Sequence, residues 1–239
     1  MKKIILGVVV LVLAAAVLLA YFAMQGPDLT AYEHLKEPAI STRPPQKMIV
    51  VEAKGDPNIV GKRAFELLFD LYYDADGVTP WPRPAPRARW PVSPGQPRAE
   101  WTGVYGLPVP DSVTDLPIHV AVPGLRASLT TWAYGDVVEL LYVGPYDEET
   151  PTLKRLAAFA LDKGYVVTSP HEEEYLKGPG MFFRGNPDNY VTILRYEVRP
   201  VVDGPAADEA AVDQGATDEA SADEGSTEED AVDEAIVDE

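Results

Sequence analysis

The sequence predicts an α+β fold in which two pseudo-symmetric strand–helix–strand–strand units form one curved antiparallel sheet with helices on one face, preceded by an N-terminal transmembrane helix. Three observations predict this fold. The N-terminus carries an uncharged apolar run, two later segments each follow a strand-like pattern with a helical one, and both segments place Val-Glu, then Gly and Pro, just before the helix.

Residues 4–23 contain no charge and are rich in Leu, Val, Ile and Ala. A helix of this length spans roughly 30 Å, the thickness of the hydrocarbon core. Lys2 and Lys3 precede it, so the N-terminus is expected in the cytoplasm and the rest outside the cell membrane. A cleaved signal peptide is the alternative, but its apolar core is usually only about 7–15 residues. We therefore expect an uncleaved single-pass anchor over residues 1–25.

A polar, proline-bearing stalk (residues 26–46) leads into the predicted domain, residues 47–200. In the first unit, residues 47–53 have strand composition and Gly55-Asp56-Pro57 ends the strand. Apolar residues then follow at helical spacing, from Val60 to Leu71. Two more strands are expected, at residues 98–106 and 117–122.

The second unit opens with apolar, β-branched strands at residues 128–134 and 137–143, which Gly135-Asp136 is expected to join as a hairpin. A helix is predicted from Thr150, as its N-cap, to a stop at Gly164. Two strands close the unit, near residues 165–175 and 190–199.

Two segments differ from this pattern. Residues 79–98 carry seven prolines and four arginines, which favours polyproline II structure and predicts a rigid surface insertion. Residues 203–239 hold 15 acidic residues and neither Lys nor Arg. Such a segment buries too little apolar surface to fold, so residues 201–239 are expected to be a disordered acidic tail.

Composition excludes several function classes. The net charge is −18, but outside the tail 23 acidic residues face 20 basic ones, so no nucleic-acid partner is expected. The chain has no cysteine and only three scattered histidines, and it lacks phosphate-loop, zincin and α/β-hydrolase motifs. We therefore expect neither a cofactor nor a metal ion.

The second unit resembles the bacterial GyrI-like effector-binding domains, also called AraC-type or bacterial transcription-activator effector-binding domains. The resemblance rests on Gly144-Pro145-Tyr146, Gly164-Tyr165 and Glu173-Glu174-Tyr175-Leu176, in this order and spacing, and extends more weakly over residues 48–199. It implies the fold derived above, with a central pocket for small lipophilic or cationic molecules, lined by aromatic rings with a glutamate at its base. Some members are drug sensors attached to DNA-binding domains, and a subset resembles hydrolases that open strained rings. No DNA-binding region is recognisable in this sequence, so the regulator role is not expected.

Glu173 and Tyr175 are the central site candidates. Residues two apart on a strand share a face, so these two point together while Glu172 and Glu174 point the other way. A carboxylate among aromatic rings favours an organic cation, and the same carboxylate could act as a general base. A solvated edge strand is the alternative interpretation of these glutamates. The expected pocket walls are aromatic: Trp101, Tyr105, Trp132 and Tyr134.

Three functions remain open. The first is a membrane-anchored domain that binds lipophilic or cationic small molecules. The second is a hydrolase of strained-ring or electrophilic toxic molecules, with Glu173 as general base and Tyr175 orienting it. The third is an interaction protein that acts through its proline-rich loop and acidic tail. Whether the chain is an enzyme is left open, with a binding module favoured; the ligand, protein partners and oligomeric state are not predicted.

Overall fold

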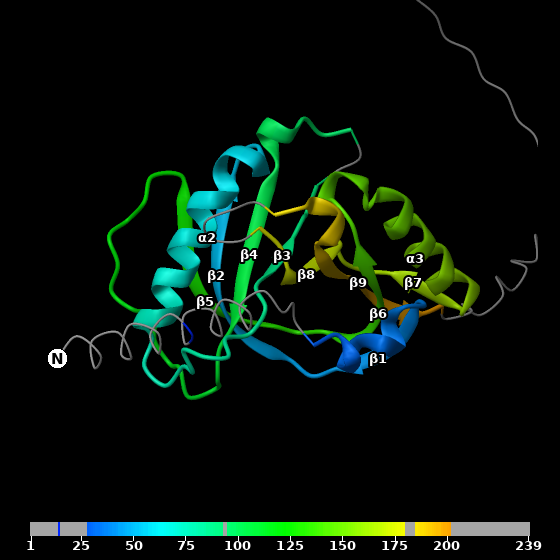
Figure 1. Ribbon diagram of the computed structural model, residues 1–239, viewed down its shortest axis with the longest axis horizontal. Helices are drawn as coiled ribbons and strands as arrows, with labels where there is room; N and C mark the ends of the chain where they lie inside the picture. The colour runs from blue at the N-terminus through cyan, green and yellow to red at the C-terminus, as the bar shows by residue number, and fades with distance from the viewer. Residues whose placement is uncertain (1–13, 15–27, 93–94, 180–184, 202–239) are drawn as a thin grey trace, which may run out of the picture. The chain divides into compact units, whose positions relative to one another are not determined.

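A computed structural model describes residues 14, 28–92, 95–179 and 185–201 of the chain (Figure 1). The predicted anchor, apart from residue 14, and the predicted acidic tail from residue 202 lie outside these residues and remain predictions. Within the described ranges, no helix is both long and apolar enough to cross a membrane.

Nine antiparallel strands form the sheet of the described domain. Their order is β1-β6-β9-β8-β3-β4-β2-β5, and β7 pairs with β9 outside this path. The strands are β1 (Ala39–Arg43), β2 (Gln46–Lys54), β3 (Arg87–Arg89), β4 (Thr102–Pro108), β5 (Leu125–Trp132), β6 (Gly135–Val143), β7 (Tyr165–Val167), β8 (Glu172–Lys177) and β9 (Val191–Pro200).

The predicted pair of units is visible in this order. Strands β2, β4 and β3 of the first unit correspond to β6, β9 and β8 of the second, so the two triplets are arranged symmetrically about the centre of the sheet. The units meet where β3 pairs with β8, with Ala88 opposite Glu173. The α+β class and the curved antiparallel sheet are thus confirmed.

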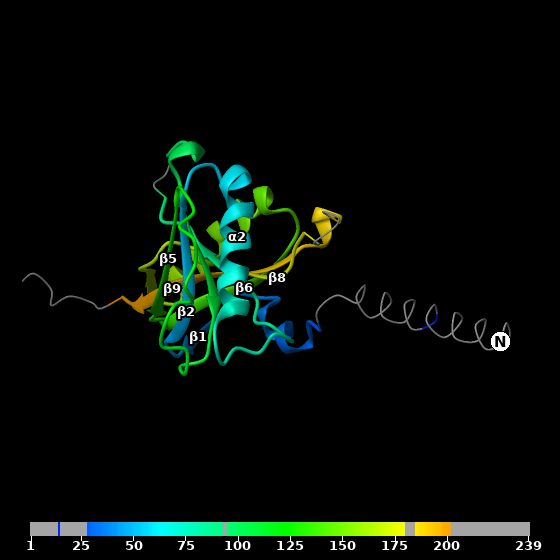
Figure 2. The ribbon, with the colours of Figure 1, turned by 90° about the vertical axis from the view of Figure 1, so that its left-hand side faces the viewer.

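Two helices lie on one face of the sheet: α2 (Pro57–Asp74) and α3 (Thr150–Asp162) (Figures 1 and 2). The Asp56 side chain caps α2 by accepting a hydrogen bond from the Asn58 amide at 2.9 Å. The helix then buries Ala64, Leu68 and Leu71 against the sheet. The sequence placed the cap of α3 at Thr150, but Thr150 is already helical and Glu149 is the capping residue.

Both helices pack on the same side because of strand register. Leu194, which contacts the α3 cluster, lies opposite Glu173, and Glu173 lies opposite Ala88, which packs in the α2 cluster. Directly opposed residues of antiparallel strands share a face. We call this side the helical face and the other side the opposite face.

Several predicted elements are corrected. The expected hairpin does not form, since β5 pairs with β2 at one end of the sheet while β6 lies between β1 and β9 near the other end. Residues 117–122 form no strand, because β5 and β4 occupy both edges of β2, and Ile118 and Val120 are exposed. The strand expected over residues 165–175 is divided at Pro170, which has no amide hydrogen to donate.

The proline-rich segment is more than a surface insertion. Its residues Arg87–Arg89 form β3, the strand through which the first unit contacts the second. Arg87 and Ala88 are buried there, so the segment supplies part of the centre of the fold. Composition concealed this strand because it is only three residues long and is flanked by prolines.

Candidate functional site

Glu173 lies at the middle of the helical face, on central strand β8. Only 4% of its surface is exposed. Tyr175 follows two residues later on the same face, as predicted, and its hydroxyl donates a 2.7 Å hydrogen bond to one Glu173 oxygen. The other oxygen lies 3.2 Å from Nε2 of His171, which directly precedes β8. The carboxyl group is therefore held in a fixed orientation.

A second buried carboxyl group accompanies Glu173. Glu149 ends the turn before α3 and its side chain hydrogen-bonds with that of Glu173. Burial first, and then the neighbouring Glu173 charge, raise the pKa of Glu149 far above the usual range of a carboxylic acid. One Glu149 oxygen has no hydrogen-bond partner among the described residues.

Aromatic rings surround this pair of carboxyl groups. The Tyr175 ring lies 5.3 Å from that of Tyr146 and 5.8 Å from that of Phe65 on α2. Phe65 in turn contacts Tyr105 of β4 at 4.9 Å, edge to face. Burial and the Glu173 charge raise the pKa of Tyr105 to about 12. The Tyr105 hydroxyl has no hydrogen-bond partner in the described part of the chain. The rings thus form an apolar surrounding for two acidic groups.

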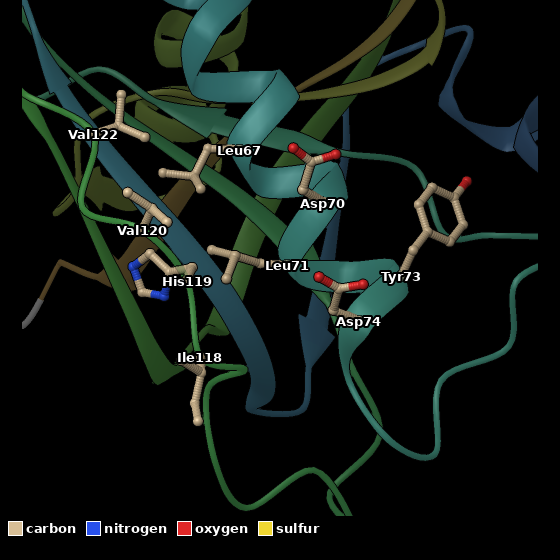
Figure 3. A pocket seen from close by; sticks show the side chains of 9 residues that line it. All are labelled: Leu67, Asp70, Leu71, Tyr73, Asp74, Ile118, His119, Val120 and Val122. Carbon is tan, nitrogen blue, oxygen red and sulfur yellow. The ribbon is translucent and has the colours of Figure 1, made fainter.

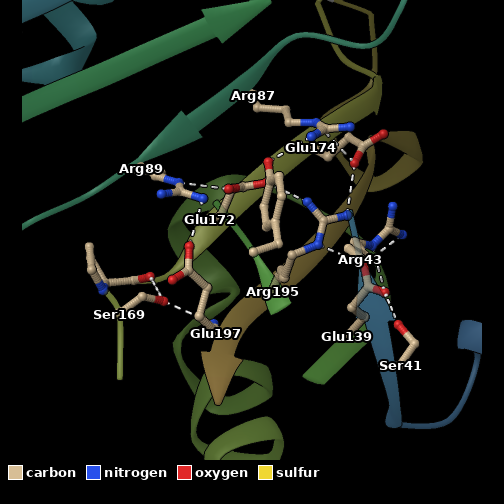
Figure 4. A network of polar contacts seen from close by, with 12 residues as sticks. Ser41, Arg43, Arg87, Arg89, Glu139, Ser169, Glu172, Glu174, Arg195 and Glu197 are labelled. Carbon is tan, nitrogen blue, oxygen red and sulfur yellow. Dashed lines mark hydrogen bonds and ion pairs between the residues drawn. The ribbon is translucent and has the colours of Figure 1, made fainter. Parts of the chain in front are cut away.

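The opposite face carries a different arrangement of charge (Figure 4). Arg195 of β9 is almost fully buried and donates to Glu139 at 2.7 Å, to Glu174 at 2.8 Å and to Glu172. Three arginines from strands β1 and β3 complete the pairs: Arg43 with Glu139, Arg87 with Glu174, and Arg89 with Glu172 and Glu197. Each of these four glutamates therefore has at least one guanidinium partner.

Glu149 and Glu173 have no such partner. Among the described residues, the ion pairs of both carboxyl groups involve His171 alone. Burying an unpaired carboxylate is unfavourable, so neutralisation must come from a proton or from a cation that is not part of the domain. This contrast between the two faces identifies the helical face as the candidate site.

The predicted site residues divide between the faces. Tyr105 joins Glu173 and Tyr175 on the helical face, and Trp101 extends this set through Trp90, whose ring lies 6.0 Å from that of Trp101 and 5.7 Å from that of Tyr105. Trp132 and Tyr134 instead lie on the opposite face, where they pack with Met48, Val50 and Val137.

Both opposite-face rings belong to the ion network. Arg89 stacks 4.1 Å above the Trp132 ring, and Arg87 donates a 2.6 Å hydrogen bond to the Tyr134 hydroxyl. Burial and Glu172 raise the pKa of Tyr134 to about 12. Neither ring can form a wall beside Glu173, because the sheet separates the two faces.

The interpretation of β8 as a solvated edge is wrong, because β8 is a central strand and Glu172, Glu173 and Glu174 are all buried. The sequence analysis did not identify Glu149 and His171 as site residues, and it named Tyr146 only as part of the Gly144-Pro145-Tyr146 motif. His171 and Glu173 are two residues apart, the spacing of residues that can share a strand face. This spacing is the one feature of the sequence that could have indicated His171 as a site residue.

Two concave regions lie apart from Glu173. One, of about 470 Å³, separates α2 from the segment before β5, with Leu67 and Leu71 on the helix side and Ile118, His119 and Val120 across from them (Figure 3). Asp70 and Asp74 also line it. The other, of about 510 Å³, includes Gln46, Tyr72 and the prolines at 82, 84, 108 and 110. Neither contains a residue of the Glu173 cluster.

Comparisons with known proteins agree with this architecture. No protein-family model matches the sequence, and no curated protein is significantly similar to it. Among solved structures, an uncharacterised conserved protein from Listeria innocua is 23% identical, with a TM-score of 0.59, over 72% of this chain and 97% of that chain. A hydrolase from Listeria innocua is 21% identical, with a TM-score of 0.57, over 73% of this chain and 100% of that one.

The C-terminal domain of EcmrR is 15% identical, with a TM-score of 0.50, over 69% of this chain and 98% of that domain. These similarities are consistent with the GyrI-like fold expected from the sequence. At such identities they show the shared fold alone.

Proposed function

We propose that this chain binds lipophilic organic cations on the helical face of its sheet. The observation that carries the proposal is the buried pair Glu149 and Glu173, which has no arginine or lysine partner in the described domain. A cationic ligand would neutralise this pair. The rings of Tyr175, Tyr146 and Phe65 would contribute about 0.5–2 kcal/mol each through cation–π contacts.

The likeness to the EcmrR C-terminal domain supports a role in binding small molecules, through the effector-binding family that the sequence resembles. If residues 4–23 are the uncleaved anchor expected from their composition, the domain would capture such molecules at the outer face of the membrane. Protease accessibility of the domain in intact cells tests this location.

Hydrolysis is the second candidate. Glu173 is oriented through both of its oxygens, by Tyr175 and by His171, as a general base that directs water would be. The likeness to a Listeria hydrolase supports this alternative. Binding and hydrolysis require the same carboxylate. They differ in whether the compound is recovered unchanged or with one water added, and one experiment can measure both.

The experiment is equilibrium dialysis of the purified full chain against a panel of lipophilic cations and strained-ring compounds, followed by mass spectrometry of both compartments. The variant is Glu173→Gln, and Glu174→Gln is its matched control, since Glu174 is equally an acidic residue of β8 but faces the opposite side. Retention of an unchanged compound that only Glu173→Gln abolishes supports binding. Addition of one water, lost in the same variant, establishes hydrolysis. Equal retention by wild type and Glu173→Gln, with no water added by either protein, contradicts both candidates.

A further inference from the structure

Three potential metal ligands converge on the helical face from different parts of the chain. Glu149 precedes α3, His171 lies between β7 and β8, and Glu173 is on β8. One side-chain donor atom from each lies within 4.8 Å of the other two. This group could not be expected from the sequence, because Glu149 and His171 are 22 positions apart and belong to no metal-binding motif.

The distances are close to those of a coordination sphere. Ligand atoms about 2.1 Å from a common ion lie about 3.0–3.4 Å apart at tetrahedral or octahedral angles. Nε2 of His171 is already 3.2 Å from Oε1 of Glu173, and it is 4.0 Å from Oε1 of Glu149. Shortening the distance between His171 and Glu149 from 4.0 Å by about 0.6 Å brings this pair into the same range.

A second observation concerns the Glu149 carboxyl group. Glu149 is 8% exposed, and one of its carboxylate oxygens accepts no hydrogen bond within the described part of the chain. Buried carboxylate oxygens normally have partners, and an oxygen without one is suited to bind an ion. We propose that Glu149, His171 and Glu173 bind one divalent transition-metal ion.

The donor set selects the class of ion. An imidazole nitrogen with two carboxylate oxygens suits Zn²⁺, Co²⁺ or Mn²⁺, whereas Mg²⁺ and Ca²⁺ prefer oxygen ligands throughout. Three protein ligands leave a coordination position for water or another small ligand. Tyr175 would orient one of the metal ligands, because its hydroxyl donates a 2.7 Å hydrogen bond to the second oxygen of Glu173. A divalent ion would neutralise the same two carboxyl groups, so the metal ion and the organic cation of the proposed function are alternative occupants of this site. The metal titration is carried out without an organic cation, so its outcome is separate from that of the dialysis experiment.

The test is a Co²⁺ titration of the purified full chain, followed by visible absorption, with Zn²⁺ added afterwards as competitor and Mg²⁺ as a control. His171→Ala is the variant, and His119→Ala is the matched control, because His119 is an exposed histidine far from Glu173 in the sequence. Weak binding by the acidic tail is the same in both proteins and cancels in the comparison. Circular dichroism checks that each variant is folded.

We expect wild type and His119→Ala to develop the spectrum of one bound Co²⁺ that Zn²⁺ displaces. His171→Ala should weaken this binding at least about tenfold, since even outer-shell changes typically have that effect. Glu149→Gln should do the same while Glu148→Gln, which alters the exposed neighbour, does not. A wild-type spectrum that is absent, or identical to that of His171→Ala, overturns the proposal. Should His171→Ala fail to fold, the two glutamate variants decide the question in the same way.

Discussion

Replacing Arg195 with methionine should strongly destabilise the domain. The guanidinium is fully buried and bonds to three carboxylates, those of Glu139, Glu172 and Glu174. Methionine keeps much of the side-chain volume but removes the charge, so three buried carboxylates each lose a partner.

The expected loss of unfolding free energy depends on the ion pairs that the three glutamates keep after the substitution. Three charge-assisted hydrogen bonds at about 1.5–3 kcal/mol each set an upper limit of about 4.5–9 kcal/mol. Each glutamate keeps a second arginine: Arg43 for Glu139, Arg87 for Glu174 and Arg89 for Glu172. We therefore expect a loss of about 3–5 kcal/mol in the free energy of unfolding, the usual range when one partner of a buried ion pair is removed. The melting temperature should fall by about 6–20 °C.

The assay is urea unfolding of the full chain, followed by tryptophan fluorescence. Arg199→Met serves as control, because Arg199 lies on the same strand but is exposed, and its replacement should change stability by no more than about 0.5 kcal/mol. A loss below about 1 kcal/mol for Arg195→Met, or a loss equal to that of Arg199→Met, would refute the view that this network stabilises the junction of the two units.

Three further predictions concern stability. Tyr105→Phe should raise the unfolding free energy by about 1 kcal/mol in the same urea assay, because it removes a buried hydroxyl that lacks a partner among the described residues; a clear loss would reveal a partner. Gly103→Ala should lower it by about 1–3 kcal/mol, because the added Cβ would lie 2.7 Å from the Tyr105 ring, and an unchanged midpoint contradicts this packing. Burial opposes ionisation of Glu139, but Arg195 and Arg43 outweigh it and lower the pKa of Glu139 below its ordinary value of 4.5. The folded state therefore binds fewer protons than the unfolded state, so this contribution is complete above pH 4.5 and is lost as the pH falls below it. Melting temperatures measured between pH 3 and 7 should show a smaller acid-induced decrease for Glu139→Gln than for wild type, and parallel curves would contradict the assignment.

Local patterns in the sequence predicted the repeat and the main site residues. Periodicity located α2 and α3, and strand alternation placed Glu173 and Tyr175 on one face. These features depend on residues close together in the chain, where spacing alone determines which side chains share a face.

Features that depend on distant residues could not be predicted in this way. The arginines of strand β3 pair with Glu172 and Glu174, which are more than 80 positions away in the chain. Without knowledge of these partners, a segment rich in proline and arginine is typical of an exposed loop. The expected hairpin failed for the same reason, since the pairing of β5 with β2 is decided by which sheet edge is free. The position of Trp132 and Tyr134 on the opposite face could not be predicted either, because alternation shows which residues of one strand share a face and not which face of the sheet that is.

The most direct test of the proposed function compares two ions of nearly identical shape and opposite charge, tetraphenylphosphonium and tetraphenylborate. Equilibrium dialysis of the full chain would measure the dissociation constant of each at the same ionic strength, for wild type and for Glu173→Gln. If the unpaired carboxyl groups of the helical face select the ligand, wild type retains the phosphonium and not the borate, and Glu173→Gln loses the phosphonium. Equal retention of both ions, or phosphonium retention unchanged in Glu173→Gln, would contradict the central claim.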